Sequence, residues 1–302
     1  MSFDCLIIGA GPAGLSAGIY LRRFHRDVCL FDTGSSRASL IPRAFNYPGF
    51  PEGISGKEFL DRLRAQFIRY GGKVVNEAVD VLNTSTENTF CAQARGQTIW
   101  AKTVLLATGI IDLEPPSLAG FGDLKADGLI RFCPICDGFE FTEQRIGIIG
   151  SGEHGVREAE FIREYTQHLS LICRGTDSDV DQSLFRRLNS NNINLIAGEV
   201  SRLYSAADRS IKLEMKDNTQ HNFDVLYCAL GTRARSELAV KLGARHDTQN
   251  CLLVDNHLQT SVPGMYAAGD VVAGLDQLAV AAGHAAIAST AIHNSLSYNE
   301  NY

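Results

Sequence analysis

Two glycine-rich turns of the same pattern constrain this chain more than any other feature. The first, Gly9-Ala10-Gly11-Pro12-Ala13-Gly14, follows the apolar run 3–8, and the second, GSGEHG at 150–155, follows the run 145–149. A helical pattern follows each turn, and the glycines of the second turn all lie 141 positions after those of the first. A G-x-G-x-x-G turn between a strand and a helix is typical of dinucleotide-binding βαβ units. The repeat therefore predicts two such units.

Other acids and glycines stand at the ends of predicted strands. Asp32 ends the second apolar strand, at the spacing from Gly9 that is expected of an acid that binds ribose hydroxyls. Thr108 and Gly109 end a third strand, and Gly269-Asp270 end a fourth. Open α/β sheets bind ligands at the carboxyl ends of their strands. The simpler interpretation of Asp270 is the N-cap of the alanine-rich helix that follows, and both roles are compatible.

The positions of structure-breaking residues predict the domain boundaries. Glu114-Pro115-Pro116 follows the third strand, and the stretch 242–249 is a second candidate crossing. We predict an α/β protein with two Rossmann-like dinucleotide-binding domains, the second inserted into the first. Residues 1–114 and 245–302 form the first domain, and residues 115–244 form the second.

The charge and hydropathy of the chain exclude several classes of partner. The 302 residues carry a formal net charge of −6 without a basic cluster, which argues against nucleic acid and anionic membrane surfaces as partners. The longest charge-free apolar-rich stretch, 277–292, is shorter than the about 20 residues of a membrane-spanning helix. The first residues lack the basic flank of a signal peptide. We therefore expect a cytoplasmic protein that does not bind membranes.

One pair among the eight cysteines stands out. Cys133 and Cys136 flank Pro134-Ile135, and Asp137 follows directly. Two thiols at this spacing can close a disulfide, one attacking a substrate and the other resolving the mixed disulfide, while Asp137 can transfer a proton to a departing thiolate. A zinc site would need four ligands, and no second pair is present, so we expect no metal. A dithiol beside two dinucleotide units implies a two-electron relay, for which a flavin is the usual carrier.

At this point the chain resembles the low-molecular-weight thioredoxin reductase family of flavoproteins. The segments GAGPAG, FNYPGFPEGISG, LLATG, CPICDGFE, GSGEHG and MYAAGDV stand in the order of their counterparts in that family. The resemblance implies a homodimer whose smaller domain rotates between two states. It also implies that Cys136 lies nearest the flavin, that Cys133 attacks the substrate disulfide and that Asp137 is the acid/base.

The resemblance further implies FAD on the first unit. The pyrophosphate would lie at the first glycine turn, the ribose near Asp32, the flavin near Asn46 and the helix starting at Gln277-Leu278, and the ribitol and phosphates near Asp270. The complete predicted set is Gly9, Gly11, Pro12, Ala13, Gly14, Asp32, Asn46, Thr108, Gly109, Gly269, Asp270, Gln277 and Leu278.

The second site departs from the family pattern. Where NADPH-binding members of that family carry a His-Arg-Arg run and another arginine shortly beyond it to bind the 2′-phosphate, this chain has Cys173, Arg174 and Gly175, and then Asp177, Asp179 and Asp181. Three acids would repel that phosphate, so NADPH is disfavoured. The predicted second-site residues are Gly150, Gly152, Glu153, His154, Gly155 and Arg174, and the occupant is left open between NADH and a second FAD. His154 is interpreted equally well as a ligand or as a surface residue.

Several functions stay open at this stage. We expect an FAD-dependent dithiol/disulfide oxidoreductase that acts on a disulfide protein of thioredoxin type or on a small-molecule dithiol. The alternatives are an oxygen-dependent oxidase of small dithiols, in which a C-P-x-C pair also occurs, an orthodox NAD(P)H thioredoxin reductase and a flavin redox sensor. His284 could face the flavin or the dithiol, and a hydrogen-bonded helix histidine is the interpretation we favour.

Overall fold

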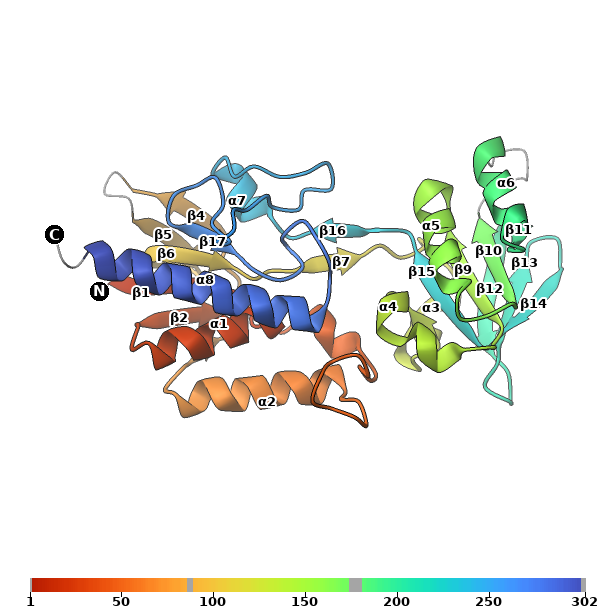
Figure 1. Ribbon diagram of the computed structural model, residues 1–302, viewed down its shortest axis with the longest axis horizontal. Helices are drawn as coiled ribbons and strands as arrows, with labels where there is room; N and C mark the ends of the chain where they lie inside the picture. Colours follow the sequence, from red (N-terminus) through yellow and green to blue (C-terminus); the bar gives the residue numbers. More distant parts are fainter. Residues whose placement is uncertain (1, 86–88, 174–180, 300–302) are drawn as a thin grey trace. The chain divides into compact units, whose positions relative to one another are not determined.

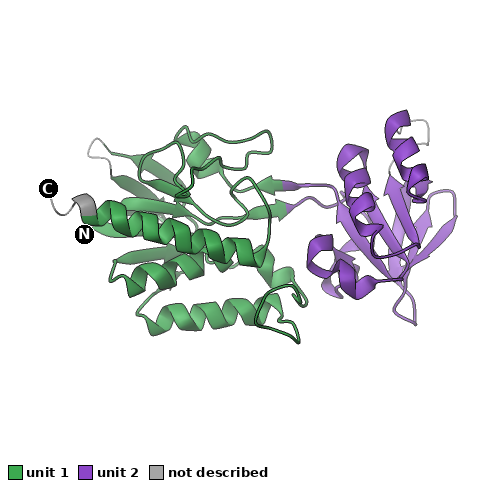
Figure 2. Cartoon of the chain, in the orientation of Figure 1, with its two compact units in different colours: residues 1–111, 233–302 green, residues 112–232 purple. Residues whose placement is uncertain are grey.

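The structure is a computed structural model that describes residues 2–85, 89–173 and 181–299. It divides into two compact units, residues 1–111 with 233–302 and residues 112–232 (Figure 2). The chain passes between them in β7 (Ile110–Asp112) and β16 (Thr232–Ala234), which pair with each other. The expected boundary at 244/245 differs from this one, because α7 (Glu237–Lys241) and Ala244 pack into the core of unit 1.

Unit 1 contains one mixed sheet in its described residues. Its strand order is β3-β2-β1-β6-β5-β4, and β17 pairs with the carboxyl half of β6. The pairs among β3, β2, β1, β6 and β17 are parallel, whereas β4 and β5 form an antiparallel extension. The strands are β1 (Ser2–Ile8), β2 (Val28–Phe31), β3 (Val74–Val75), β4 (Val81–Thr84), β5 (Phe90–Ala94), β6 (Gln97–Leu106) and β17 (Met265–Ala267).

Three long helices accompany this sheet: α1 (Pro12–Arg23), α2 (Gly56–Arg69) and α8 (Leu278–Asn299). Figure 1 shows α1 and α8 side by side, and their small side chains share one core with β1 and β2. Ala281, Ala285 and Ala288 of α8 are fully or almost fully buried there. None of the described helices has the length and apolar character needed to cross a membrane.

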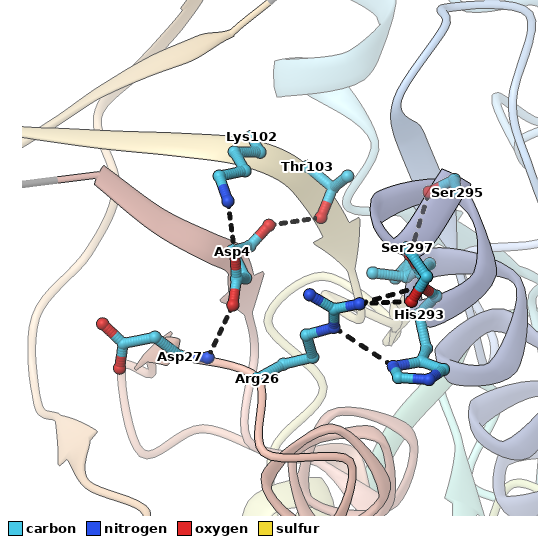
Figure 3. A network of polar contacts seen from close by, with 9 residues as sticks. Asp4, Arg26, Asp27, Lys102, Thr103, His293, Ser295 and Ser297 are labelled. Carbon is cyan, nitrogen blue, oxygen red and sulfur yellow. Dashed lines mark hydrogen bonds and ion pairs between the residues drawn. The ribbon is translucent and has the colours of Figure 1, made fainter. Parts of the chain in front are cut away.

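A polar network fastens the end of α8 to the turn before β2 (Figure 3). Arg26 is only 8% exposed. Its guanidinium donates to His293 Nδ1 at 3.1 Å, to the His293 carbonyl at 3.2 Å and to Ser297 Oγ at 2.6 Å. A buried guanidinium needs such acceptors, and these three bonds tie it to the C-terminal helix.

Unit 2 repeats the βαβ arrangement on a smaller parallel sheet. In the described part of this unit the strand order is β11-β10-β9-β15-β8, beside an antiparallel sheet β12-β13-β14. The parallel strands are β8 (Ile130–Arg131), β9 (Ile146–Gly150), β10 (Leu169–Cys173), β11 (Asn194–Ala197) and β15 (Val225–Ala229). The antiparallel strands are β12 (Val200–Ser205), β13 (Ile211–Met215) and β14 (Gln220–Phe223).

The helices of unit 2 include the segments predicted to carry the chemistry. They are α3 (Phe121–Ala126), α4 (Pro134–Asp137), η2 (Gly138–Phe141), α5 (Gly152–Ile162) and α6 (Gln182–Ser190). The second glycine turn thus joins β9 to α5 as the first joins β1 to α1. The predicted α/β class with two Rossmann-like units is confirmed.

Candidate functional site

The first glycine turn brings β1 and α1 together more closely than side chains would permit. A Cβ on Gly9, where φ is +106°, would lie 2.3 Å from the Ala107 carbonyl oxygen, and one on Gly14 would lie 1.8 Å from that of Gly9. Gly11 differs, because a Cβ there would meet only Ser36 Oγ, at 3.3 Å, among atoms within 4 Å. Gly11 is the N-cap of α1 without a capping side chain. The first turn of α1 therefore begins without a side-chain cap from Gly11, at a helix N-terminus that favours anions.

Asp32 is held next to this turn by backbone amides. Its Oδ1 accepts from the Ala10 amide at 3.0 Å, and its Oδ2 accepts from the Gly34 amide at 2.9 Å. The carboxylate is 9% exposed, and Arg64 lies 3.8 Å from Oδ2. The acid that the spacing singles out is thus at the end of β2, beside Ala10.

Other predicted cofactor residues are joined to one another across long sequence separations. Asn46 Nδ2 donates to Gln277 Oε1 at 2.8 Å, and Gln277 begins the first turn of α8. Gly269 has a φ of +77°, and a Cβ there would lie 2.9 Å from Ala13 Cβ. The second of these contacts places Gly269, which follows β17, against the first turn of α1.

Thr108 and Asp270 have partners of their own. Thr108 Oγ1 donates to the Arg235 carbonyl at 2.6 Å. The Asp270 carboxylate lies 3.6 Å from Arg37 Nη1. The interpretation of Asp270 as the N-cap of the alanine-rich helix is wrong, because α8 begins only at Leu278. Asp270 is therefore a loop residue after β17.

His284 of α8 carries a buried polar atom without a protein partner. Its Nδ1 has no hydrogen bond within the described chain, so the interpretation as a hydrogen-bonded helix histidine is wrong. Burial lowers the pKa of His284, against the attraction of the Asp270 charge. A neutral ring nitrogen left unpaired in the interior is costly unless a bound molecule supplies a partner. Sequence pattern could not reveal this, because α8 is apolar around most of its circumference.

Cys133 and Cys136 are joined by a disulfide at the start of α4. Cys133 is the N-cap of this short helix and Pro134 its first residue. By contrast, burial raises the pKa of the single cysteines Cys5 and Cys228 to about 12. Burial thus keeps these two single thiols protonated, and the redox role of Cys133 and Cys136 stays a prediction from their spacing.

Asp137, the last residue of α4, is a buried acid with two partners. Its side chain is 13% exposed, and Tyr227 Oη donates to its Oδ1 at 2.6 Å. Arg131 Nε lies 3.5 Å from Oδ2. Burial raises the pKa of the Asp137 carboxyl above its usual value, opposed by Tyr227 and Arg131 and aided by the charge of Glu140. A carboxyl that stays protonated to higher pH is suited to donate a proton.

Sequence reasoning missed both partners of Asp137. Tyr227 is fully buried in an otherwise apolar strand. A buried tyrosine hydroxyl usually has a hydrogen-bond partner, and a tyrosine in an apolar strand was the one sequence signal that could have indicated such a partner. Arg131 is the second residue of β8, a strand of two residues, which is too short to show a recognisable sequence pattern.

The second glycine turn is built like the first but has different surroundings. A Cβ on Gly155 would lie 3.0 Å from the Gly150 carbonyl carbon, whereas Gly152, at φ +58°, has no atom within 4 Å of such a Cβ. Glu153 pairs with Arg187 Nη1 at 2.7 Å. His154 is 58% exposed, and its Nε2 lies 3.6 Å from Glu158 Oε2.

Only some of the residues predicted to lie near a bound 2′-phosphate are among the described residues. Cys173 is buried at the end of β10. Asp181 is the N-cap of α6, and its Oδ1 accepts from the Ser183 amide at 2.7 Å. Arg174, Gly175, Asp177 and Asp179 lie outside the described residues.

Comparison with known proteins agrees with this architecture. The model of the family "Pyridine nucleotide-disulphide oxidoreductase" matches residues 3–286. The thioredoxin reductase of Aquifex aeolicus (strain VF5) is 27% identical over 305 residues, which cover 98% of this chain and 94% of that protein. The crystal structure of thioredoxin reductase from Streptococcus pyogenes MGAS5005 has a TM-score of 0.89 at 24% identity, covering 98% of this chain and 99% of that one.

A bifunctional relative is longer than this chain. The "Bifunctional thioredoxin reductase/thioredoxin" of Mycobacterium leprae (strain TN) is 27% identical over 277 residues, 89% of this chain. The match spans 60% of that protein's length.

Proposed function

Because this chain belongs to the pyridine nucleotide-disulphide oxidoreductase family, we propose that it is an FAD-dependent dithiol/disulfide oxidoreductase of thioredoxin reductase type. Electrons pass between a flavin on unit 1 and the Cys133/Cys136 pair on unit 2. The observation that carries the proposal is the Cys133–Cys136 disulfide with the buried, partnered acid Asp137 next to it. It occurs in a chain that also contains two dinucleotide turns.

The residues of unit 1 fit FAD. The uncapped start of α1 at Gly11 suits a pyrophosphate, Asp32 suits a ribose, and the unpartnered Nδ1 of His284 calls for a polar group. Asn46 and Gln277, joined by their hydrogen bond, would lie on the flavin side. When bound, FAD supplies two-electron transfer to or from the disulfide.

The protein's own groups carry out the exchange with substrate. In the reduced pair, the Cys133 thiolate attacks the substrate disulfide and forms a mixed disulfide, and the departing thiolate takes a proton from Asp137. The Cys136 thiolate then attacks Cys133 sulfur, which releases the second substrate thiol and restores the internal disulfide. The substrate is reduced by two electrons as the Cys133/Cys136 pair is oxidised.

A disulfide protein of thioredoxin type is the substrate that these observations favour. Ile135 lies between the two cysteines and is 45% exposed, and Phe139, two residues after Asp137, is 75% exposed. Exposed apolar side chains beside a reactive disulfide suit the apolar contact surface of a protein partner. Relatives named thioredoxin reductases agree with this choice. We further propose that the protein acts as a cytoplasmic homodimer.

Reduction by NADPH is expected to be poor. Two lost arginine contacts to a 2′-phosphate would weaken NADPH by about 10²–10⁴-fold. The test is stopped-flow reduction of the purified, FAD-loaded protein by NADPH and by NADH, with the FAD content per chain measured beforehand. Faster reduction by micromolar NADPH than by NADH would reject this part of the proposal, and two FAD per chain would assign the second turn to FAD.

The thiol roles are tested by single substitutions. Cys133→Ser leaves Cys136 unpaired next to the flavin and should strengthen a thiolate-to-flavin charge-transfer band, whereas Cys136→Ser should remove it. Visible absorbance between pH 6 and pH 9 measures the band. The opposite pattern would reverse the assigned roles, and a protein that cannot be loaded with FAD would reject the function.

A further inference from the structure

Two side chains of neighbouring strands converge on the acid beside the disulfide. Arg131 of β8 and Tyr227 of β15 are direct partners in the parallel register of these strands. Register partners on adjacent strands project from the same face of a sheet. Both reach Asp137, Tyr227 Oη at 2.6 Å from Oδ1 and Arg131 Nε at 3.5 Å from Oδ2. The sheet thereby holds both oxygens of a carboxyl that belongs to α4.

Phe141 adds a second attachment to the same pair. Its ring centroid lies 6.4 Å from that of Tyr227 at an interplanar angle of 87°, and the Arg131 guanidinium carbon lies 5.4 Å from the Phe141 ring centroid. Edge-to-face aromatic contacts and cation–π contacts each add stability beyond burial. Since Phe141 ends η2, directly after α4, the segment 134–141 is fixed to Arg131 and Tyr227 at two points.

We propose that Tyr227 and Arg131 are positioning residues that hold the Asp137 carboxyl for thiol–disulfide exchange and stabilise the carboxylate that remains after it has donated its proton. This inference rests on the proposed function. Tyr227 donates to Oδ1, and the Arg131 guanidinium faces Oδ2, so both oxygens of the carboxylate have a donor or a cation beside them.

The exchange step balances with this assignment. The bond between Cys133 sulfur and a substrate sulfur forms as the substrate S–S bond breaks, and the electron pair leaves on the second substrate sulfur. That thiolate takes the proton from the Asp137 carboxyl and departs as a thiol. The new Asp137 carboxylate is then stabilised by the Tyr227 hydroxyl and the Arg131 charge, while burial and Glu140 favour the return of a proton.

The decisive variant is Tyr227→Phe, which removes one oxygen and keeps the ring against Phe141. We expect the protonation midpoint of Asp137 to rise by about one to two pH units, because a lost hydrogen bond to a charged group no longer favours the carboxylate. The carboxyl stretch in infrared difference spectra of the full-length protein reports this midpoint directly, and Asp137→Asn identifies the band. The rate at which dithiothreitol reduces the Cys133–Cys136 disulfide, plotted against pH, should have its alkaline limb shifted in the same direction.

A matched control and a second variant keep the test decisive. Tyr266→Phe removes another buried hydroxyl, which bonds Ser295 in unit 1, and should leave the Asp137 midpoint unchanged. If Tyr227→Phe does not fold, Arg131→Met takes its place, with an upward shift expected from the loss of the cation. An unshifted or lowered midpoint in the folded variant would overturn the inference.

The infrared titration needs neither FAD nor a substrate. A wild-type protein that reduces no disulfide would therefore reject the proposed function. If the enzyme is active but the protonation midpoint of Asp137 is the same in the wild type and in Tyr227→Phe, only the positioning role is rejected.

Discussion

The two glycine turns of this protein share a backbone and differ in what surrounds it. In unit 1 the strand after the turn ends in Asp32, whose carboxylate is held by the Ala10 and Gly34 amides. In unit 2 the corresponding strand ends in the buried Cys173. The acid nearest the second turn, Glu153, is instead paired with Arg187.

The difference teaches that the motif specifies a close approach of strand and helix, and not a ligand. Gly14 and Gly155 are both required by contacts with the first glycine of their own turn. Whether a turn binds a given dinucleotide depends on the side chains beyond it. Unit 1 has Asp32 directly after β2 and a histidine nitrogen without a protein partner, whereas unit 2 has the buried Cys173 at the position that corresponds to Asp32.

The largest effect that would separate the two turns is the loss of FAD from one of them. Gly11→Val places a side chain at the start of α1, where a Cβ would lie 3.3 Å from Ser36 Oγ. We expect FAD affinity to fall by more than about 10²-fold, because the pyrophosphate loses charge-assisted hydrogen bonds. FAD per chain, from absorbance after desalting, measures the loss.

Gly152→Asn is the matched change in the second turn, since asparagine tolerates the positive φ of this position. It should leave one FAD on each chain. Equal loss of FAD from both variants would mean that the two turns do not differ in the way described here.

A second comparison concerns the two buried acids. Backbone amides hold Asp32, whereas the side chains of Tyr227 and Arg131 hold Asp137, whose pKa is raised by its burial. Asp137→Asn keeps an oxygen for the Tyr227 hydroxyl but cannot donate the proton, so we expect thiol–disulfide exchange to slow by about 10²–10⁴-fold. Single-turnover rates with a disulfide substrate from pH 5 to pH 9 measure this.

The Asp137→Asn substitution should not lower the stability of the protein at alkaline pH, although it lowers the activity. A carboxyl whose pKa is raised by folding contributes stability below its unfolded pKa and loses it as the pH rises through the folded pKa. The Asp137→Asn variant is neutral, so its thermal midpoint at pH 8 should be no lower than that of the wild type. A clear loss of both stability and activity would make Asp137 a structural residue.

Local sequence patterns predict most of the fold and part of the candidate site. The strand–turn–helix units and the cysteine pair depend on residues close in sequence, so the sequence alone could predict them. The boundary at 244/245 was wrong because α7 is a single short turn whose buried Ala239 gives too weak a signal. Tyr227 and Arg131 meet Asp137 only through the register of β15 with β8, which no local pattern encodes.

The smallest effect concerns two arginines, each of which lies just before a parallel strand of its own unit. Arg26 lies buried before β2 and donates three hydrogen bonds to His293 and Ser297 of α8. Its loss should leave buried acceptors unpaired, so we expect Arg26→Ala to lower the free energy of unfolding of unit 1 by about 2 kcal/mol. Urea unfolding followed by the fluorescence of Trp100 in β6 measures this change.

Arg145, directly before β9, is the control for this change. It bonds Asp224 with two nitrogens, but its side chain is 46% exposed, and solvent screens such a pair. Arg145→Ala should therefore cost about 0.5 kcal/mol, measured by hydrogen exchange of the β9 amides. If the two substitutions cost the same, burial does not decide the strength of these contacts, and the end of α8 must be held in place chiefly by its apolar face, through Ile292 and Leu296.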